Sequence, residues 1–419
     1  MARVFADITP LRVSAPYRRL WVGISISNIG QQITAVAVGL QIYDMTKSSL
    51  MVGLVGLAQV VPLVGFGLYG GALSDAFDRR RVGLITGLGL WLCSMLFLAQ
   101  SLLDLNSVGL LYAIIAVQSS FFAVGVPARQ AIVPRLVPRD LLPAANALNS
   151  MSWNLGFSIG PLVSGGLVAA TGTIAAPYLV DAVAFAVLVW SMWRLPSLPP
   201  TPSSSGQITR AGWRAVGEGL AFIKGKRNLQ MIFYEDLAAM IFGMPRALFP
   251  AIAALWYGGS TQQVALTLGL LSAAPAIGGV LSSLLSGPIG TVRYQGRAVV
   301  VAIIVWGVAI TAFGFTRTLV LALAFLALAG AADNVSAILR NTMLQAAVPD
   351  EFRGRLQGVN TVVIAGGPRL GDVEAGVVAS LGGEALSVIS GGIACTVIAI
   401  GLAAKFPGFW RYDARNPVP

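Results

Sequence analysis

Long apolar segments separated by short polar ones make up most of the chain. Twelve of these segments approach the roughly 20 residues that a helix needs to cross a bilayer. They lie at residues 20–43, 50–74, 82–101, 107–128, 143–168, 175–193, 229–256, 262–286, 298–314, 318–339, 356–380 and 385–404. The pattern predicts an all-α membrane protein with twelve transmembrane helices.

The composition favours a membrane protein over a soluble one. Of 419 residues, 56% are hydrophobic and only 11% are charged, whereas about a quarter of the residues of a soluble domain are charged. The low fraction of charged residues therefore agrees with twelve apolar spans.

The distribution of basic residues predicts how the spans are oriented. Of the 28 Lys and Arg residues, 24 fall in the N-terminal tail, the even-numbered loops or the C-terminal tail. Cytoplasmic loops carry such an excess. We therefore expect a multi-pass protein of the cell inner membrane with both termini in the cytoplasm. The net charge of +11 then reflects topology and not a nucleic-acid partner.

A polar segment divides the chain in two. Residues 196–227 are rich in Pro and Ser and end in a stretch where Trp213, Val216 and Leu220 recur at helical spacing. This pattern is typical of a flexible linker followed by an amphipathic helix on the membrane surface. We expect an N-terminal six-helix bundle at 1–195, a cytoplasmic linker at 196–227, and a C-terminal six-helix bundle with a short cytoplasmic tail at 228–419.

The two halves resemble each other. A shift of 211 residues places Arg129 on Arg340 and Asn149 on Asn360. The same shift places Gly156, Gly160, Gly165 and Gly172 on Gly367, Gly371, Gly376 and Gly383. Parallel repeats of this kind are typical of secondary transporters of the major facilitator type. The sequence therefore predicts two pseudo-symmetric bundles in the major facilitator fold.

The loop between the second and third spans resembles a motif of the major facilitator superfamily. The segment GALSDAFDRRR matches that motif at Gly71, Leu73, Asp75, Arg79 and Arg80, although Asp78 stands where a glycine is usual. The resemblance implies that Asp75 accepts hydrogen bonds from the amino end of a helix of the other bundle when the cytoplasmic side is closed. The arginines would supply its counter-charge.

A second motif lies in the fifth span. The segment GFSIGPLVSGG, with Gly156, Gly160, Pro161 and Gly165, is similar to a motif of antiporter members of the superfamily. Glycines permit close helix contact, and the proline removes one backbone hydrogen bond. The resemblance implies a helix that takes part in gating, and tight packing without gating is the alternative.

Over its whole length the chain looks like the branch that contains the enterobactin exporter and macrolide efflux proteins. The resemblance implies proton-coupled antiport that exports a small organic molecule, a siderophore or an amphipathic multidrug substrate, by rocker-switch alternating access. A lysolipid or lipid flippase of the same fold and an importer remain as alternatives. The duplicated architecture argues against a channel or receptor.

Ionisable residues inside the spans are candidates for proton coupling. Such residues cost about 2.5–3.5 kcal/mol on insertion scales and usually face a cavity. The chain has no histidine, so a carboxyl group must carry any proton. The candidates are Glu235, Asp236, Asp333, Asp372 and Glu374. One alternative is that they form structural ion pairs, and Arg369 and Asp372 have the i,i+3 spacing of such a pair. Another is that Asp372 and Glu374 lie in water near the outer mouth.

Polar residues of spans one, seven and eleven are candidates for the substrate cavity. They are Asn28, Gln31, Arg246 and Arg369. Glu235 and Arg246 are eleven residues apart, so a continuous helix would present both on one face. Asn28 and Gln31 have a second interpretation, in which they bind a neighbouring helix.

Several classes of site are not expected. Without histidine the chain offers no Ser-His-Asp triad, and its two cysteines, Cys93 and Cys395, are too far apart in sequence for a CxxC site. The segment GLAFIKGKR departs from a P-loop in its glycine spacing and in its last residue. We expect no enzyme activity, no metal and no cofactor, a proton gradient instead of ATP as the energy source, and a monomer in the bilayer.

Overall fold

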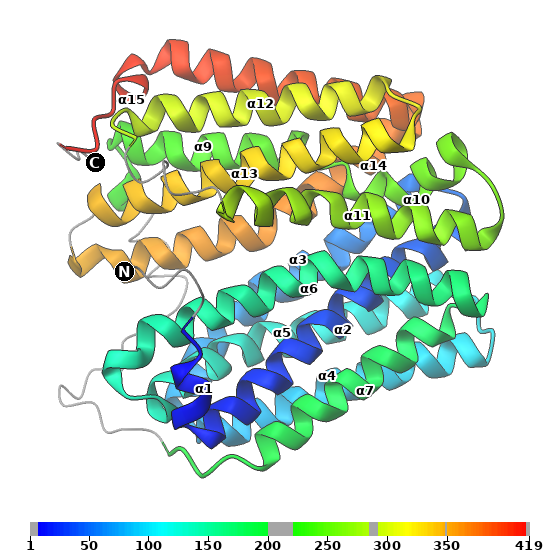
Figure 1. Cartoon of the computed structure of the whole chain (residues 1–419), viewed down its shortest axis with the longest axis vertical. Coiled ribbons are helices and arrows are strands. Elements are labelled where there is room, and N and C mark those ends of the chain that lie inside the picture. The colour runs from blue at the N-terminus through cyan, green and yellow to red at the C-terminus, as the bar shows by residue number, and fades with distance from the viewer. Residues whose placement is uncertain (1–6, 200–220, 285–291, 348–349, 416–419) are drawn as a thin grey trace. The chain divides into compact units, whose positions relative to one another are not determined.

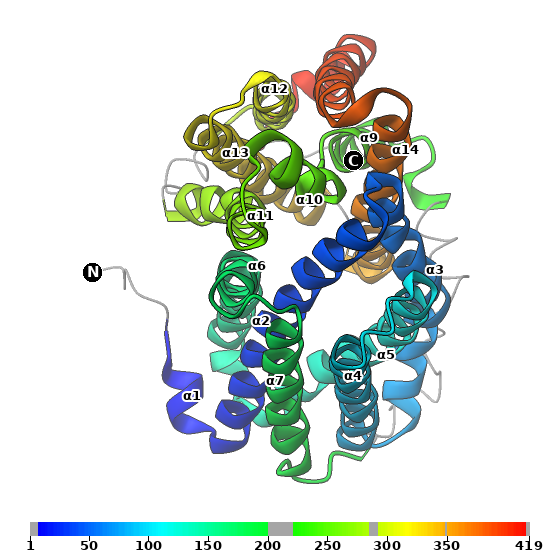
Figure 2. The same cartoon turned by 90° about the vertical axis from the view of Figure 1, so that its right-hand side faces the viewer.

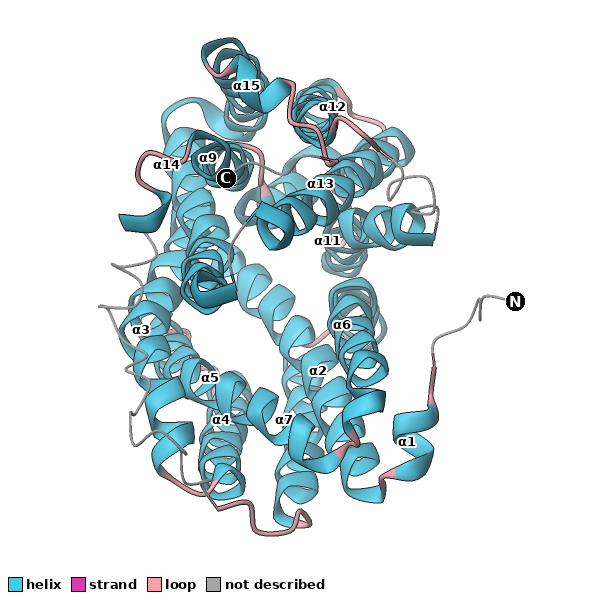
Figure 3. Ribbon diagram, turned by 90° about the vertical axis from the view of Figure 1, so that its left-hand side faces the viewer, coloured by secondary structure: helices cyan, strands magenta, loops and turns pink. Residues whose placement is uncertain are grey.

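The computed structural model describes residues 7–199, 221–284, 292–347 and 350–415, except for the side chains of residues 68–76, 345, 350–355, 357–358 and 361–362. The residues described form helices joined by short loops, and no strand occurs among them (Figure 3). Most of the predicted linker helix lies outside this range.

Ten of the described helical segments are long and apolar enough to cross a membrane. The first predicted span lies in a further helix, α2 (Ala15–Thr46), whose polar side chains lower its hydropathy. The last two predicted spans lie together in α14 (Asp350–Lys405), where the backbone of Gly383 is not helical. The prediction of an all-α membrane protein is confirmed.

The chain divides into two compact units. Unit 1 comprises Met1–Gln41 and Val61–Gly212, and unit 2 comprises Ile42–Val60 and Trp213–Pro419. The segment that joins α2 to α3 (Ser49–Ala76) therefore belongs to unit 2, although the sequence places it in the first half.

Unit 1 contains most of α2, the second part of α3, and the helices α1 (Thr9–Val13), α4 (Arg79–Leu102), α5 (Val108–Leu136), α6 (Leu142–Thr171) and α7 (Ala175–Trp193). Here α4 packs against α5 and α7 (Figure 2). Buried side chains such as Leu90, Ile132 and Phe185 form the core of this packing.

Unit 2 contains α9 (Arg227–Phe242), α10 (Phe249–Ile252), α11 (Thr261–Leu284), α12 (Gln295–Phe315), α13 (Leu319–Ala347), α14 and α15 (Pro407–Trp410). In Figure 1, α12 lies beside α13 and α14, and α14 also packs on α9. A Cβ atom on Gly278 of α11 would collide with the carbonyl oxygen of Ala327 on α13, so these two helices approach at backbone distance. A Cβ on Gly330 of α13 would meet Pro275 in the same way.

The internal repeat of the sequence is also present in the helix boundaries of the structure. Shifting α5 (Val108–Leu136) by 211 residues gives the bounds of α13 (Leu319–Ala347). Gly172, which ends α6 with φ +70°, corresponds to Gly383, which breaks α14 with φ +84°. Only glycine adopts such angles without strain, so the repeated glycine ends the same helix in each half.

The segment Ile42–Val60 packs closely against α14. The backbone of Gly53 lies against Asp372, and that of Gly56 lies against Arg369. The Ser49 hydroxyl also donates a hydrogen bond to Glu384 at 2.8 Å. These contacts fix the part of α14 that carries three of the predicted site residues.

Candidate buried charge cluster

The second unit buries two acidic residues and one arginine in a common site. Glu235 and Asp236 on α9 are 0% and 4% exposed, and Arg340 on α13 is 5% exposed. The Arg340 guanidinium Nη2 lies 2.7 Å from Asp236 Oδ1, and its Nη1 donates to Ser336 Oγ at 2.7 Å. The pair neutralises the charge of Asp236 inside the unit.

Glu235, unlike Asp236, does not form an ion pair with a described residue. Neither of its carboxyl oxygens has a hydrogen-bond partner among the described residues. Burial of an ionised carboxylate without a hydrogen bond is very costly. A carboxyl group in this setting is stable when it carries a proton and needs water or a partner when it releases one.

The seventh predicted span coincides with the candidate membrane span Arg227–Tyr257, but this span is not one continuous helix. The helix α9 ends at Phe242, where the amide of Gly243 bonds to the carbonyl of Ala239. Pro245 cannot donate a backbone hydrogen bond and so prevents a regular continuation. The chain resumes as a 3-10 turn at Arg246–Leu248, then α10 and a π turn at Ala253–Tyr257. Glu235 and Arg246 therefore do not share one helix face.

The break directs Arg246 towards α14. Its Nη2 lies 3.8 Å from Asp372 Oδ2, and the Arg246 side chain is 42% exposed. The expected i,i+3 pair of Arg369 and Asp372 is not among the ion pairs of the described residues. Arg369 instead donates from Nη1 to the carbonyl of Ala365 at 2.9 Å, and its buried Nε has no hydrogen-bond partner among the described residues.

Asp333 on α13 lies within electrostatic range of three charged residues, Asp236, Arg340 and Arg246. It therefore interacts electrostatically with members of both ion pairs. Glu374, the fifth candidate, is half-buried on α14 and forms no ion pair with a described residue. Four of the five predicted proton-coupling candidates thus belong to one charge cluster in unit 2.

The cavity candidates of the first span lie on α2 in unit 1. The Asn28 amide donates to Ser152 Oγ on α6 at 3.2 Å, so it takes part in helix packing. Gln31 is half-buried. A Cβ on Gly156 would lie 3.1 Å from the Asn28 carbonyl oxygen, and one on Gly160 would meet Ile29 at 3.1 Å. The motif of the fifth span therefore brings α6 close to α2, and Pro161 and Gly165 are buried in the same helix.

The loop motif of the first half is described only in part. Gly71, Leu73 and Asp75 lie in α3, but their side chains are outside the described range. Arg79 Nη1 donates to the carbonyl of Ala131 at 3.2 Å, and Arg80 Nη2 donates to the carbonyl of Trp193 at 2.6 Å. Both arginines thus bind helix carbonyls within unit 1.

Asp78 has a role that the sequence did not indicate. It is the N-cap of α4, accepting from the Arg80 amide at 2.9 Å, and it also accepts from the Ser197 hydroxyl at 2.6 Å and the Leu198 amide at 3.3 Å. Burial acts to raise the pKa of Asp78, but these hydrogen bonds outweigh it and lower the pKa. The residue fixes the segment that follows α7 to the start of α4.

Two buried arginines lie inside helices, although the hydropathy pattern predicts that they lie in loops. Arg129 lies in α5 and Arg340 in α13, and they are 8% and 5% exposed. In contrast to Arg340, Arg129 has no carboxylate partner among the side chains that the structure describes. The signal for a special position was their match at the repeat shift of 211 residues.

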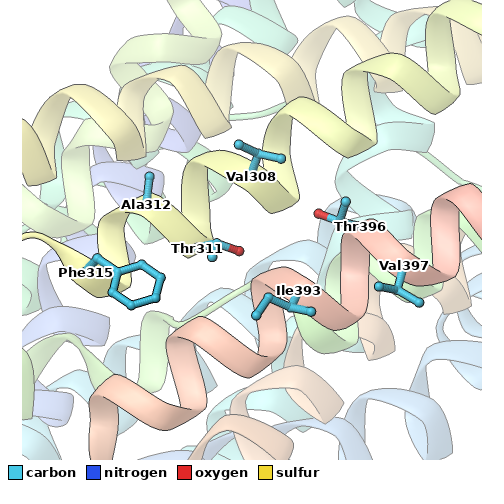
Figure 4. A pocket seen from close by; sticks show the side chains of 7 residues that line it. All are labelled: Val308, Thr311, Ala312, Phe315, Ile393, Thr396 and Val397. Atoms are coloured by element: carbon cyan, nitrogen blue, oxygen red, sulfur yellow. The ribbon is translucent and has the colours of Figure 1, made fainter.

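A groove of about 370 Å³ lies between α12 and α14 (Figure 4). Its lining is apolar except for Thr311 and Thr396, which donate to the carbonyls of Gly307 and Gly392 on their own helices at 2.8 and 2.9 Å. Phe315 and Val397 at its edge are 70% and 60% exposed. This apolar surface suits contact with lipid chains.

Known proteins resemble the chain along its whole length. A family model described as transmembrane secretion effector matches residues 5–416. Enterobactin exporters from Shigella boydii serotype 18 and Citrobacter koseri are 29% and 28% identical to the chain. The first alignment covers 98% of this chain and 96% of the relative, and the second covers 99% and 97%.

Solved structures share the fold at low identity. The nucleoside transporter NupG aligns with a TM-score of 0.71 at 14% identity, covering 95% of this chain and 100% of that one. A bacterial homologue of the human lysosomal transporter Spinster aligns with a TM-score of 0.70 at 16% identity, covering 98% of each chain. The predicted superfamily and branch are confirmed: the chain belongs to the transmembrane secretion effector family of the major facilitator superfamily and is a multi-pass membrane transporter.

Proposed function

We propose that the protein is a proton-coupled antiporter that exports a small organic molecule across the cell inner membrane. A catechol-type siderophore is the first candidate substrate, since the relatives that match nearly the full chain are named enterobactin exporters. Twelve spans in two six-helix bundles, with both termini in the cytoplasm, would alternate access by a rocker-switch movement. The loop motif around Asp75 would bias that movement.

The observation that carries the proposal is the environment of Glu235. This carboxyl group is fully buried and has no hydrogen-bond partner among the described residues, while the adjacent Asp236 is paired with Arg340 at 2.7 Å. A buried acid of this kind gains or loses a proton only when its surroundings change. Glu235 is therefore the proton carrier we favour.

The second step of the proposal concerns the substrate. Arg246 is 42% exposed on its side chain and lies 3.8 Å from Asp372, a long distance for an ion pair. The buried Nε of Arg369 has no hydrogen-bond partner among the described residues. Catechol oxygens, neutral or anionic, are acceptors that guanidinium groups bind well. A substrate of this class would compete with Asp372 for Arg246, and its release would let the Arg246–Asp372 pair form again.

Flux measurements in reconstituted vesicles test the coupling. An outward-directed proton gradient should drive uptake of a catecholate siderophore, and dissipating the gradient should remove that uptake. Glu235→Gln should abolish gradient-driven uptake and keep exchange of labelled for unlabelled substrate. The matched control is Asp181→Asn, a fully buried carboxyl of unit 1 that lies outside the charge cluster. The assignment of Glu235 as proton carrier would be refuted if flux did not depend on the proton gradient. It would also be refuted if both variants lost gradient-driven uptake equally.

The same vesicles distinguish the alternative functions. A macrolide and a lysophospholipid tested beside the siderophore separate drug export and lipid flipping from siderophore export. Uptake driven only by an inward-directed proton gradient would indicate an importer.

A further inference from the structure

The C-terminal segment of unit 2 folds back onto the start of α12. Phe409 and Tyr412 are 1% and 4% exposed, and the amide of Ala414 donates to the carbonyl of Arg293 at 2.9 Å. The short helix α15 packs against α9, α12 and α14 at this end of the unit (Figure 1). The segment is therefore an ordered part of the surface at the ends of the spans.

This surface carries a concentration of positive charge. We define the C-terminal basic patch as Arg293, Arg297, Lys405, Arg411 and Arg415, all of which are exposed. Within residues 292–299 and 403–415 the only acidic residue is Asp413, which pairs with Arg293 at 2.8 Å. The patch therefore keeps an excess of four positive charges.

Aromatic rings hold several of these cations in place. The Arg297 guanidinium lies 5.4 Å from the ring of Tyr294 and 5.2 Å from that of Trp410. Arg293 lies 5.1 Å from Tyr294, and the Lys405 ammonium lies 5.7 Å from its neighbouring ring. Cations within about 6 Å of a ring centre are attracted to its face. A guanidinium held in this way still presents its N–H groups at its edge for an anionic partner.

The patch lies at the ends of candidate membrane spans, where lipid headgroups are expected. Candidate membrane spans begin at Gln295 and end at Lys405, within two residues of three of the five cations. Aromatic residues such as Trp410 are enriched at this level of a bilayer. The charge distribution predicts that these span ends face the cytoplasm, whose leaflet carries anionic lipids.

We propose that the C-terminal basic patch binds the headgroup of an anionic phospholipid. The partner is a phosphodiester at membrane depth, recognised by guanidinium groups that aromatic rings have already positioned. Positive charge that serves only to orient a span needs no such arrangement. The inference does not depend on which solute is transported, since it concerns the end of unit 2 away from the charge cluster.

Lipid binding to the purified full-length protein tests the proposal. Native mass spectrometry should count bound phosphatidylglycerol and phosphatidylcholine of the same acyl chains at equal concentrations. We expect phosphatidylglycerol to bind more tightly, and the variant Arg297→Gln/Arg411→Gln to reduce that preference by roughly fivefold for each cation removed. The charge-preserving variant Arg297→Lys/Arg411→Lys should retain most of the preference.

The matched control is Arg317→Gln at the other end of α12. Arg317 also lies over an indole, 4.0 Å from the ring of Trp256, but it is outside the patch. Its substitution should leave the phosphatidylglycerol preference unchanged. Equal binding of both lipids to the wild type, or equal loss in the Arg317 variant and the double Gln variant, would overturn the proposal. A failure here would leave the proton-coupling proposal unaffected.

Discussion

In unit 1 the buried polar groups between α2, α4 and α7 are mostly neutral. Gln41 and Gln100 exchange two amide hydrogen bonds of 3.1 and 3.0 Å, and Tyr178 donates to Gln41 at 2.7 Å. The buried acid of this region, Asp181, accepts from the Ser94 hydroxyl at 2.7 Å. Each of these hydrogen bonds joins two different helices.

In unit 2 the corresponding interior is ionic. Asp236 and Arg340 form a buried pair, and Arg246 and Asp372 form a second pair nearer the surface. The two units share a repeated scaffold, yet Arg340 pairs with a carboxylate while its repeat partner Arg129 does not pair with any described one. The scaffold is repeated, but the buried ionic groups described here are concentrated in the second copy.

The largest expected effect comes from breaking the buried pair of unit 2. Arg340→Gln leaves Asp236 uncompensated and should destabilise the protein by about 3–5 kcal/mol. The double variant Arg340→Gln/Asp236→Asn should recover most of this loss, because it leaves no buried charge. Thermal unfolding in detergent measures both. Arg129→Gln is the comparison in unit 1, and a loss there as large as in Arg340→Gln would contradict the contrast between the units.

A smaller effect is expected from overfilling a helix contact. Gly278→Ala puts a methyl group against the carbonyl of Ala327, so α11 and α13 must separate. Overpacking of this kind costs about 1–3 kcal/mol. Gly65→Ala in α3 is the matched control, since nothing lies within 4 Å of a Cβ built there. Equal unfolding temperatures for the two variants would show that the α11–α13 contact is not tight.

The neutral network should matter less to stability and not at all to coupling. Tyr178→Phe loses the hydrogen bond to Gln41 and keeps the stacking on Phe97, whose ring centre is 5.4 Å away. We expect a destabilisation of about 1 kcal/mol with unchanged gradient-driven flux. Glu235→Gln should show the reverse, with little change in stability and lost coupling. Loss of gradient-driven flux in Tyr178→Phe would contradict the proposed difference between the two units.

The smallest effect concerns pH and the N-cap of α4. The pKa of Asp78 is lowered in the folded protein, so the carboxylate stabilises the fold above its ordinary pKa of 3.8, and this stabilisation is lost as the pH falls through the lower folded value. Asn is an equally good N-cap, so Asp78→Asn removes only the charge. Water screens this partly exposed group, and the loss at pH 7 should be a few tenths of a kcal/mol. The unfolding temperatures of variant and wild type should converge in acid; a constant gap would show that charge is not the cause.

Much of the fold could be predicted from the sequence. A helix needs a minimum apolar length to cross a bilayer, and a backbone with positive φ favours glycine. Each predicted span falls on helical segments of the structure where it is described, and the repeat correctly matched Gly172 to Gly383. Hydropathy, however, marks only the apolar centre of a helix. Arg340 was therefore assigned to a loop, although α13 continues past it to Ala347.

The ion pairs inside the charge cluster could not be predicted from the sequence for a different reason. Local spacing suggested that Arg369 would pair with Asp372, but the break at Gly243 and Pro245 turns Arg246 towards the same carboxylate. Which cation meets which acid depends on contacts between α9, α13 and α14 that are far apart in the chain. The acids themselves were identified because charges are rare inside apolar spans.

The burial of both cysteines has a practical consequence. Cys93 and Cys395 are unpaired and only 2% and 0% exposed, and the chain contains no other thiol. A cysteine engineered at a single surface position would be the one group that a membrane-impermeant maleimide reaches. The natural chain is thus a ready background for mapping, in intact cells, which loops face each side of the bilayer.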